Sequence, residues 1–336
     1  MKMGCAPVII ATLNRSQHFI RLVESLKRNT WAKYTDVFVG LDYPPSEKYL
    51  SGYNQICDYL SGDFPEFASF HVIRREVNVG SIKNFAMLRD YVLARYDRFI
   101  RTDDDAEFSP NFLEYINKCL DKYDHDDNVV AVCGYSYPLS WIGSCQSSII
   151  KANFNCSMWG TGFWKQKYIR MIDFIESGGL LSPSDPNNVE KAISRMIDVA
   201  KYEYLNLCVV ASRSHNLVEK MSDISVRLYM ALNNKWVIIP KVSKVRNWGF
   251  DGSGVYCPEV VRKNGKQTAY NYDYRSQEID NDNSFTLSED TLGDVVANKR
   301  ILNSFDALPL KYKVRLYVKL VLLKFLGVRN YVKLFS

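Results

Sequence analysis

Apolar runs and amphipathic segments alternate through the first 135 residues, and this alternation limits the folds that the chain can adopt. The predicted strands cover 7–12, 37–42, 70–74, 97–102 and 129–134, and the predicted helices cover 17–27, 49–60, 81–96 and 111–122. In the first of these helices, Phe19, Leu22, Val23 and Leu26 fall on one face. Repeated strand–helix units favour a mostly parallel, doubly wound central sheet flanked by helices, so we expect an α/β, Rossmann-like fold.

The pattern becomes less regular after residue 135, where aromatic residues and glycine gather. We expect later helices and one late strand at 165–177, 188–200, 222–232 and 236–240. Residues 264–306 are polar and predicted to form loops with short helices. With 336 residues and a 47% hydrophobic composition, the chain is long enough for a sizeable core and lacks the composition of a disordered protein.

Three consecutive aspartates, Asp103, Asp104 and Asp105 (the aspartate triplet), follow the strand predicted at 97–102. Adjacent carboxylates repel one another, so a fold rarely gathers them unless a cation or solvent separates their charges. Open α/β sheets bind their ligands at the carboxyl ends of the strands, which is where the triplet falls. Hard oxygen ligands at that edge suit Mg²⁺ or Mn²⁺ bridging phosphates, and simple solvent exposure is the alternative.

Polar residues also follow the first two predicted strands. Thr12, Asn14 and Arg15 come after the first strand, where they can bind a base or a diphosphate, although surface polar residues are common there. Asp42 ends the second strand, where its carboxylate can reach a ribose hydroxyl or a base N–H. The alternative for Asp42 is a turn-initiating role before two prolines.

A loop at 78–84 enters the third predicted helix and offers four more candidates, Asn78, Gly80, Lys83 and Asn84. Gly80 permits close approach of the backbone to a ligand, and Lys83 or Asn84 can reach a phosphate or a sugar. The alternative is an ordinary loop in which Ser81 caps the helix. The sequence contains no G-x-x-x-x-G-K-[ST] or G-x-G-x-x-G pattern, so a P-loop or a dinucleotide site is not supported.

The basic excess of the chain is confined to its last segment. The net charge is +6, and seven of the 43 basic residues lie in 309–336, where none of the 37 acidic residues lies. Leu310, Val314, Tyr317, Val321 and Phe325 recur there at helical spacing. An apolar stripe with basic flanks is typical of a helix lying on an anionic membrane, and a helix packed on the body is the alternative.

The cysteines and the apolar runs indicate where in the cell the protein is expected. The eight cysteines form no C-x-x-C pair and fit a reduced environment, with no disulfide framework or zinc site. No apolar run reaches the ~18 residues of a spanning helix, and the start is too short for a secretory signal. We therefore expect a cytoplasmic protein that is peripheral on the inner face of the cell membrane, and no nucleic-acid partner.

Taken in order, five elements resemble the GT-A-fold glycosyltransferases of the family 2 type, especially enzymes of bacterial surface polysaccharides. They are the 12–15 segment, Asp42, the Asn78-x-Gly80 loop, the triplet, and the aromatic segment 159–164. The triplet also resembles the acidic DXD metal motif of the N-acetylglucosaminyltransferase I group. The resemblance spans roughly residues 5–257. It implies a nucleotide-sugar-binding half at 1–135, an acceptor-binding half at 136–257, a polar region at 258–308 and the basic tail at 309–336.

The resemblance implies roles for the donor residues. Thr12, Arg15 and Asp42 would hold the nucleoside, while Asp103 and Asp104 would face the ribose and the donor sugar or its phosphates. Asp105 would ligate Mn²⁺ or Mg²⁺, which would neutralise the leaving diphosphate.

The resemblance also implies a carboxylate base where a helix begins in the second half, because enzymes of this kind that invert configuration need one. Asp223 is our candidate, with Glu219 and Asp173 as substitutes, and the alternative for Asp223 is a helix cap. Trp159 and Gly160, with Phe163 and Trp164, are expected to wall the sugars, and core packing is the alternative for Trp164. The segment 246–254 resembles a loop near such active sites, but Tyr256 and Cys257 stand where a histidine is often found, so no histidine ligand is implied.

The sequence therefore predicts a metal-dependent, inverting hexosyl- or N-acetylhexosaminyltransferase. The expected donor is a nucleoside diphosphate sugar, with UDP as the favoured nucleotide, and the expected acceptor is a free or lipid-linked saccharide. A nucleotidyltransferase is one alternative, but an enzyme of that class would need a glycine-rich phosphate loop near the N-terminus, and residues 12–16 contain no glycine. A non-catalytic sugar-nucleotide or glycan-binding module is the other.

Overall fold

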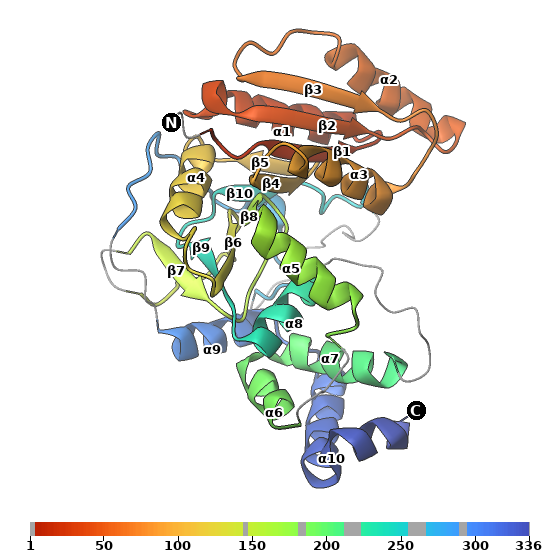
Figure 1. Ribbon diagram of the computed structural model, residues 1–336, viewed down its shortest axis with the longest axis vertical. Coiled ribbons are helices and arrows are strands. Elements are labelled where there is room, and N and C mark those ends of the chain that lie inside the picture. Colours follow the sequence, from red (N-terminus) through yellow and green to blue (C-terminus); the bar gives the residue numbers. More distant parts are fainter. Residues whose placement is uncertain are drawn as a thin grey trace.

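The computed structural model describes residues 4–143, 147–180, 186–211, 223–254, 267–288 and 294–335. Within these residues the centre is an eight-stranded mixed sheet in the order β3-β2-β1-β4-β8-β6-β9-β7 (Figure 1). A two-stranded ribbon, β5 with β10, lies beside it. The fold is therefore the α/β fold, with a mostly parallel central sheet flanked by helices, that the sequence predicts.

Four parallel strands form the first part of the sheet: β1 (Val8–Thr12), β2 (Asp36–Leu41), β3 (Ser69–Arg74) and β4 (Arg98–Asp103). The second part is mixed and contains β6 (Val129–Cys133), β7 (Ile149–Ala152), β8 (Thr161–Trp164) and β9 (Trp236–Pro240). Strand β8 runs antiparallel to both β4 and β6, and so joins the two parts. The ribbon consists of β5 (Ala106–Phe108) and β10 (Val245–Asn247).

Side chains alternate across the strands and build two cores. Ile9, Phe38 and Phe99 face the core that includes α3 (Ser81–Leu93) and α5 (Lys165–Glu176). Val8, Ile10 and Val37 face the opposite core, which includes α1 (Ser16–Lys27), α2 (Leu50–Tyr59) and α4 (Phe112–Lys122). This period of two, with helices on both faces, is what a doubly wound sheet requires.

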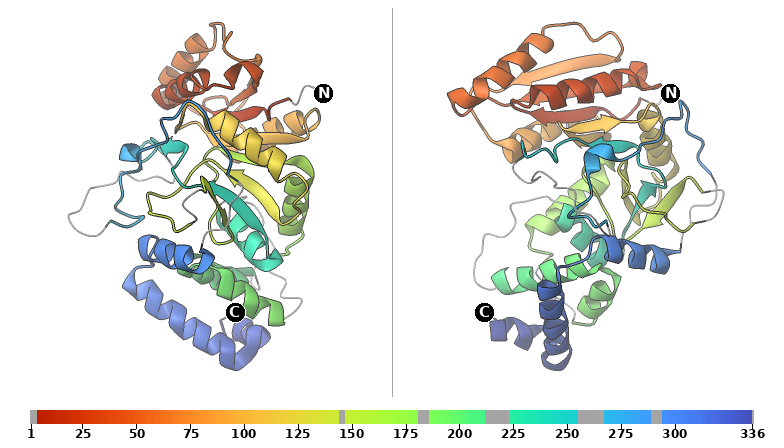
Figure 2. Two further views of the ribbon diagram at one scale, coloured as in Figure 1. Left: turned by 90° about the vertical axis from the view of Figure 1, so that its left-hand side faces the viewer. Right: turned by 180° about the vertical axis from the view of Figure 1, so that it is seen from behind.

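The remaining helices lie mainly away from the β3 edge (Figure 2). They are α6 (Pro186–Arg195), α7 (Asp198–Ala211), α8 (Asp223–Asn233), α9 (Val295–Phe305) and α10 (Leu310–Phe335), with short 3-10 helices at Ala32–Tyr34, Glu47–Tyr49 and Tyr274–Ser276. Helix α10 packs on α7 and α6 at the end of the molecule opposite β3 (Figure 1). None of the helices in the described ranges combines the length and the hydrophobicity needed to cross a bilayer.

Helix α10 has two distinct faces. Leu316 and Leu323, seven residues apart, are buried against the body. The stripe predicted from the sequence points the other way: Leu310, Val314, Tyr317, Val321 and Phe325 are 77%, 55%, 53%, 53% and 81% exposed. The helix breaks at Gly327, whose φ of 70° lies in the left-handed region that suits glycine. The tail is therefore anchored to the body by one face and leaves an apolar face uncovered.

Several local predictions are wrong. The Ser109-Pro110 pair has the residue types of a helix cap and first helical residue, but α4 begins at Phe112 with Asn111 as its N-cap, so both residues precede the helix. The helix predicted at 188–200 is two helices, α6 and α7. Strands β5, β7, β8 and β10 were not predicted, because runs of three or four residues give too little periodicity to recognise.

Candidate functional site

The aspartate triplet lies at the carboxyl end of β4, as predicted. Asp103 is the last residue of the strand, and Asp104 with Asp105 forms the tight turn into β5. Strand β1 runs alongside, with Ala11 opposite Asp103, so Thr12 and the residues after it come to the same edge. Asp104 and Asp105 are only 6% and 5% exposed. The carboxylates are therefore withdrawn from bulk solvent.

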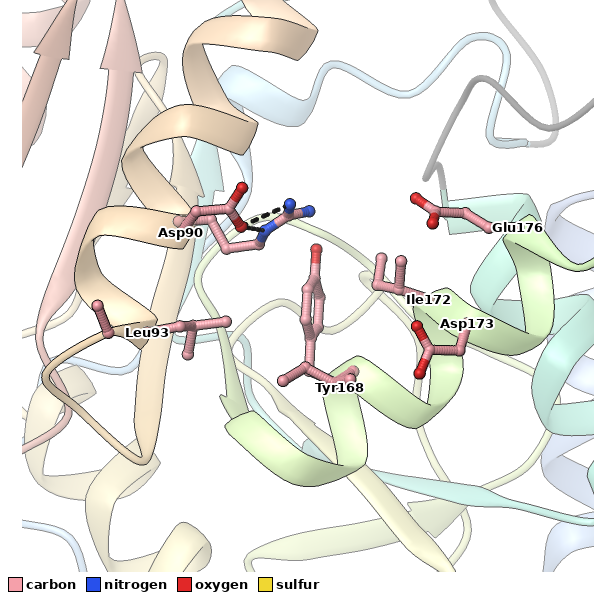
Figure 3. A pocket seen from close by; sticks show the side chains of 9 residues that line it. Asp90, Leu93, Tyr168, Ile172, Asp173 and Glu176 are labelled. Carbon is pink, nitrogen blue, oxygen red and sulfur yellow. Dashed lines mark hydrogen bonds and ion pairs between the residues drawn. The ribbon is translucent and has the colours of Figure 1, made fainter.

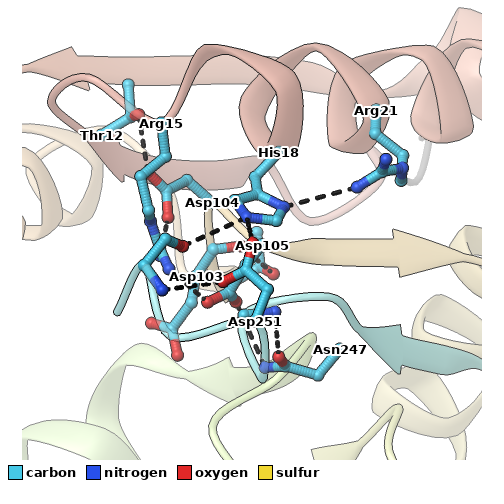
Figure 4. A network of polar contacts seen from close by, with 12 residues as sticks. Thr12, Arg15, His18, Arg21, Asp103, Asp104, Asp105, Asn247 and Asp251 are labelled. Carbon is cyan, nitrogen blue, oxygen red and sulfur yellow. Dashed lines mark hydrogen bonds and ion pairs between the residues drawn. The ribbon is translucent and has the colours of Figure 1, made fainter. Parts of the chain in front are cut away.

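Thr12 and Arg15 reach the triplet directly (Figure 4). The Thr12 hydroxyl donates to Asp104 Oδ2 at 2.8 Å. The Arg15 guanidinium pairs with Asp104 Oδ1 and, through Nη1 at 2.9 Å, with Asp105 Oδ2. The structure thus gathers four of the predicted donor-site residues into one polar cluster.

The electrostatics of the cluster leave an excess of negative charge. Burial, together with repulsion from Asp103 and Asp104, raises the pKa of Asp105 to about 7 despite the nearby Arg15. Burial likewise raises the pKa of Asp103, and Asp223 and Asp104 add to that shift. Burial alone would lower the pKa of Arg15, but Asp104 and Asp105 raise it. Arg15, together with Arg101 at Asp103, therefore does not offset the burial and mutual repulsion of the three carboxylates.

Asp42 organises the neighbouring loop. Its carboxylate accepts the backbone N–H groups of Val79 and Gly80 at 2.9 Å each, and the Asn78 amide donates to it at 3.2 Å. Gly80 has a φ of 82° and is itself the N-cap of α3, so the predicted Ser81 cap is wrong. The structure thus joins Asp42, Asn78 and Gly80 at the edge of β2, and their contact with a nucleoside stays a prediction.

The other residues near this edge differ in exposure. Lys83 is exposed on α3, and the Asn14 side chain is half-buried. Asn84, predicted to reach a ligand, is instead 1% exposed: its amide donates to Gly40 O at 2.7 Å and accepts from Arg75 Nε at 2.9 Å. Asn84 therefore ties α3 to β2 inside the fold.

The candidate base, Asp223, is the first residue of α8, as predicted. Burial raises its pKa, while Arg227 and Arg101 lower it. Asp223 in turn raises the pKa of Asp103, so the two carboxylates lie within electrostatic reach of one another. Arg101 lies two residues before Asp103 on β4 and also acts on both. Asp223 and Asp103 therefore share Arg101 as a charged neighbour, and the role of Asp223 as a base stays a prediction.

Of the two substitutes for Asp223, only Asp173 can be placed in the structure. Glu219 lies outside the described residues. Asp173 lines a separate cavity of about 340 Å³ between α3 and α5, with Arg89, Asp90 and Glu176 also in its wall (Figure 3). None of the residues that line this cavity belongs to the triplet or to α8.

The aromatic segment 159–164 divides into two parts. Trp159 is half-buried and joins an aromatic cluster with Tyr135 and Phe250, at ring distances of 4.6 and 5.9 Å. Gly160 has a φ of 63°, and a Cβ there would lie 2.8 Å from Phe108. Phe163 and Trp164 were expected to wall the sugars, but both are buried on β8. A strand buried on both faces explains that error, since it leaves neither ring for a ligand.

Sequence reasoning singled out neither Asn247 nor Gly249, two residues from far along the chain that contact the triplet. The Asn247 amide donates to Asp105 Oδ1 at 3.2 Å, and Gly249 lies against the same carboxylate. His18 of α1 meets Asp251 at 2.9 Å. The 246–254 segment therefore does lie beside the triplet, as its resemblance implied, while Tyr256 and Cys257 fall outside the described residues.

The donor set at the triplet suits a divalent cation that shares its coordination with phosphates. The carboxylates are hard oxygen ligands carrying more negative charge than Arg15 offsets. In the described ranges, no group of three or more His, Cys, Asp or Glu side chains is arranged to hold a metal alone. Magnesium and manganese sites of nucleotide enzymes commonly use one or two carboxylates, with water and substrate oxygens completing the shell.

Comparison with known proteins gives one family and several distant structures. The family model described as Glycosyl transferase family 2 matches residues 8–177. Similar solved structures include the mannosyltransferase PcManGT from Pyrobaculum calidifontis in complex with GDP-Man and Mn²⁺, at 14% identity, 49% coverage of this chain, 46% of that chain and a TM-score of 0.35. Another is S. aureus TarS 1–349, at 12% identity, 70% coverage of this chain, 58% of that chain and a TM-score of 0.38.

The chain thus spans about half the length of these two structures. No curated protein matches its sequence. Because the TM-scores are low, only the family match over 8–177 bears on what the chain is.

Proposed function

Because this chain belongs to glycosyl transferase family 2, we propose that it moves a sugar from a nucleoside diphosphate donor, expected to be a UDP-sugar, to a saccharide acceptor. The acceptor is a free or lipid-linked saccharide of a bacterial surface polysaccharide. The reaction depends on a divalent cation and inverts the configuration of the sugar.

One observation carries this proposal: the negatively charged edge formed by half-buried Asp103 and buried Asp104 and Asp105, with Thr12 and Arg15 beside it. A diphosphate cannot bind three carboxylates unless a cation intervenes. Arg15 supplies one positive charge, and a divalent metal held through Asp105 would supply the rest and neutralise the leaving diphosphate.

The chain's own residues divide the remaining work. Thr12, Arg15 and the loop held by Asp42 bind the nucleoside and the diphosphate, and Asp103 with Asp104 orients the ribose and the donor sugar. Asp223 accepts the proton of the acceptor hydroxyl as that oxygen attacks the anomeric carbon. Asp223 is half-buried and its pKa is raised, which makes it a better base than a carboxylate of ordinary pKa, because its pKa lies nearer to the working pH.

A thermal-shift screen tests the donor half of the proposal. Nucleotide sugars carrying UDP, GDP, CDP and dTDP are added with and without Mn²⁺, since a ligand that binds only the folded chain raises its melting temperature. We expect stabilisation by one nucleotide class, and only with the metal. Stabilisation by none of them would contradict the proposal.

We also propose that α10 rests on an anionic membrane, where a lipid-linked acceptor would be found. Its uncovered apolar stripe is flanked by Lys311, Arg315 and Lys324, all exposed, and 309–336 contains no acidic residue. Exposed apolar residues next to basic ones are attracted to acyl chains and anionic headgroups together. This assignment would place the enzyme on the inner face of the cell membrane.

A further inference from the structure

A late segment of the chain closes over the aspartate triplet. Strand β10 pairs antiparallel with β5, and Asn247 lies opposite Ala106, the residue directly after Asp105. The Trp248 N–H then donates to the Asp105 carbonyl at 2.8 Å. We call residues 247–251 the clamp segment. It reaches Asp105 across 142 positions of sequence.

Within the clamp segment, Asn247 fixes one oxygen of Asp105. Its Nδ2 donates to Asp105 Oδ1 at 3.2 Å, while its own Oδ1 accepts the Gly249 N–H at 2.7 Å. Asn247 is 1% exposed, so these bonds meet no competition from solvent. Because Arg15 pairs with the other oxygen, Oδ2, the two partners together set the rotation of the carboxylate.

Gly249 gives independent evidence of the same contact. A Cβ at this position would lie 2.1 Å from Asp105 Oδ2 and 2.9 Å from its Cγ. No side chain fits there unless the carboxylate moves. The backbone of the clamp segment and the side chain of Asn247 therefore enclose Asp105 from one side.

The clamp segment is itself held to the first half of the chain. Trp248 Nε1 donates to Glu107 Oε2 at 2.8 Å, and the Arg21 guanidinium lies 4.1 Å from the centre of the Trp248 ring. His18 meets Asp251 at 2.9 Å (Figure 4). These contacts anchor the segment to α1 and β5, so its position over Asp105 is fixed from both sides.

We propose that Asn247 is a positioning residue that holds the Asp105 carboxylate in the orientation needed to bind the metal–nucleotide complex. This inference rests on the proposed function and deepens it. Residues that hydrogen-bond a metal ligand commonly change metal affinity roughly 10–100-fold when they are replaced. The clamp segment would thereby make the metal site depend on the second half of the chain.

The test measures Mn²⁺ affinity in the full-length protein, by electron paramagnetic resonance of free Mn²⁺ with UDP, GDP, CDP and dTDP in turn. For Asn247→Ala we expect the Mn²⁺ dissociation constant to rise roughly 10–100-fold. Gly249→Ala should raise it as well, because its Cβ displaces the carboxylate. In both variants the rate of sugar transfer at saturating Mn²⁺ should fall by a smaller factor than the affinity for Mn²⁺.

Asn117→Ala is the matched control. Asn117 is 2% exposed and also makes two hydrogen bonds, from the Ala6 N–H at 2.7 Å and to the Leu113 carbonyl at 2.8 Å, but none to the triplet. It should lose stability without changing Mn²⁺ affinity. Suppose that wild type binds Mn²⁺ with a nucleotide. If the Mn²⁺ dissociation constants of both clamp variants then stay within about twofold of the wild-type value, or if Asn117→Ala raises that constant as much as they do, the positioning role is wrong while the proposed function stands. If wild type binds no metal–nucleotide complex, the proposed function fails with it.

Discussion

The aspartate edge and helix α10 depart from the usual distribution of residues in opposite ways. At the edge, Asp104 and Asp105 are 6% and 5% exposed, whereas on α10 Leu310 and Phe325 are 77% and 81% exposed. Folded chains ordinarily bury apolar side chains and expose charged ones. Each departure lowers stability unless something outside the chain completes the region. A cation with a nucleotide would complete the edge, and a lipid surface would complete the helix.

The two regions also differ in how they are held. The carboxylates at the edge are fixed by hydrogen bonds and ion pairs from two segments, through Thr12 and Arg15 of the first and Asn247 of the clamp segment. The stripe on α10 is instead held through other residues of its helix, such as Leu316 and Leu323, which pack on the body. Variants at the edge should therefore strongly lower the rate of sugar transfer. Variants on the stripe should weaken binding to membranes and leave the rate of transfer unchanged.

The largest expected effect is at Asp105. Asp105→Ala should lower kcat/KM by about 10³-fold, because metal binding and charge neutralisation contribute several kcal/mol to the transition state. Steady-state transfer with Mn²⁺ measures this. Asp97→Ala is the control, since that carboxylate is 84% exposed at the start of the same strand and should leave transfer unchanged. Equal activity of the two variants would remove Asp105 from the mechanism.

Asp223 comes next. Asp223→Asn should lower the rate of transfer roughly 10²–10³-fold by removing the base, while the nucleotide still binds at the separate edge. Rates of transfer and nucleotide-induced thermal shifts, measured on one preparation, separate the two effects. A variant that transfers normally would show that Asp223 only begins the helix.

Variants of the α10 stripe should have a smaller effect, and should change membrane binding instead of the rate of transfer. Replacing Val314, Val321 and Phe325 together by serine should weaken cosedimentation with phosphatidylserine-containing vesicles at least about tenfold, since each residue gains about 1.5–3 kcal/mol on burial. Transfer to a water-soluble acceptor should not change. Val296→Ser, at a residue 61% exposed on α9, serves as the control. If the protein bound neutral vesicles as strongly as anionic ones, the basic residues of α10 would not contribute to membrane binding.

The smallest effect is on stability against pH. The pKa of Asp105 is about 7 in the folded chain against an ordinary value of 3.8, so the folded state holds a proton that the unfolded state has lost. The resulting penalty grows as pH rises from about 4 to about 7. Without metal, Asp105→Asn should therefore be more stable than wild type at pH 8, by at most the roughly 4 kcal/mol that a shift of about three pKa units corresponds to, and equal to it near pH 4. Urea titrations at both pH values measure this, and a pH-independent difference would contradict it.

The parts of the site that could be predicted from the sequence are those fixed by local pattern. The β4 strand end places the triplet, and the neighbouring β1 brings Thr12 and Arg15 to it, because parallel strands end at one edge. Helical spacing also predicts that the five stripe residues share one face of α10, and their similar exposures confirm this, whereas the direction in which that face points was left open.

Long-range pairing explains what could not be predicted. Asn247 and Gly249 reach Asp105 through a ribbon of three-residue strands that carries no periodic signal. Phe163 and Trp164 were misassigned because β8, a four-residue strand, enters the sheet antiparallel between β4 and β6. Asn84 has a side chain suited to a ligand, and only the packing of α3 on β2 shows that its amide is already bonded.

The most direct test of the central claim is release of the nucleoside diphosphate from the nucleotide sugar found in the thermal-shift screen, in the presence of an acceptor saccharide. The release is followed with Mn²⁺, after chelation with EDTA, and after Mn²⁺ is restored. We predict release with Mn²⁺, its loss on chelation, its recovery on restoration, and none from Asp105→Ala. Equal release by wild type in EDTA would contradict the metal-dependent account of the aspartate edge.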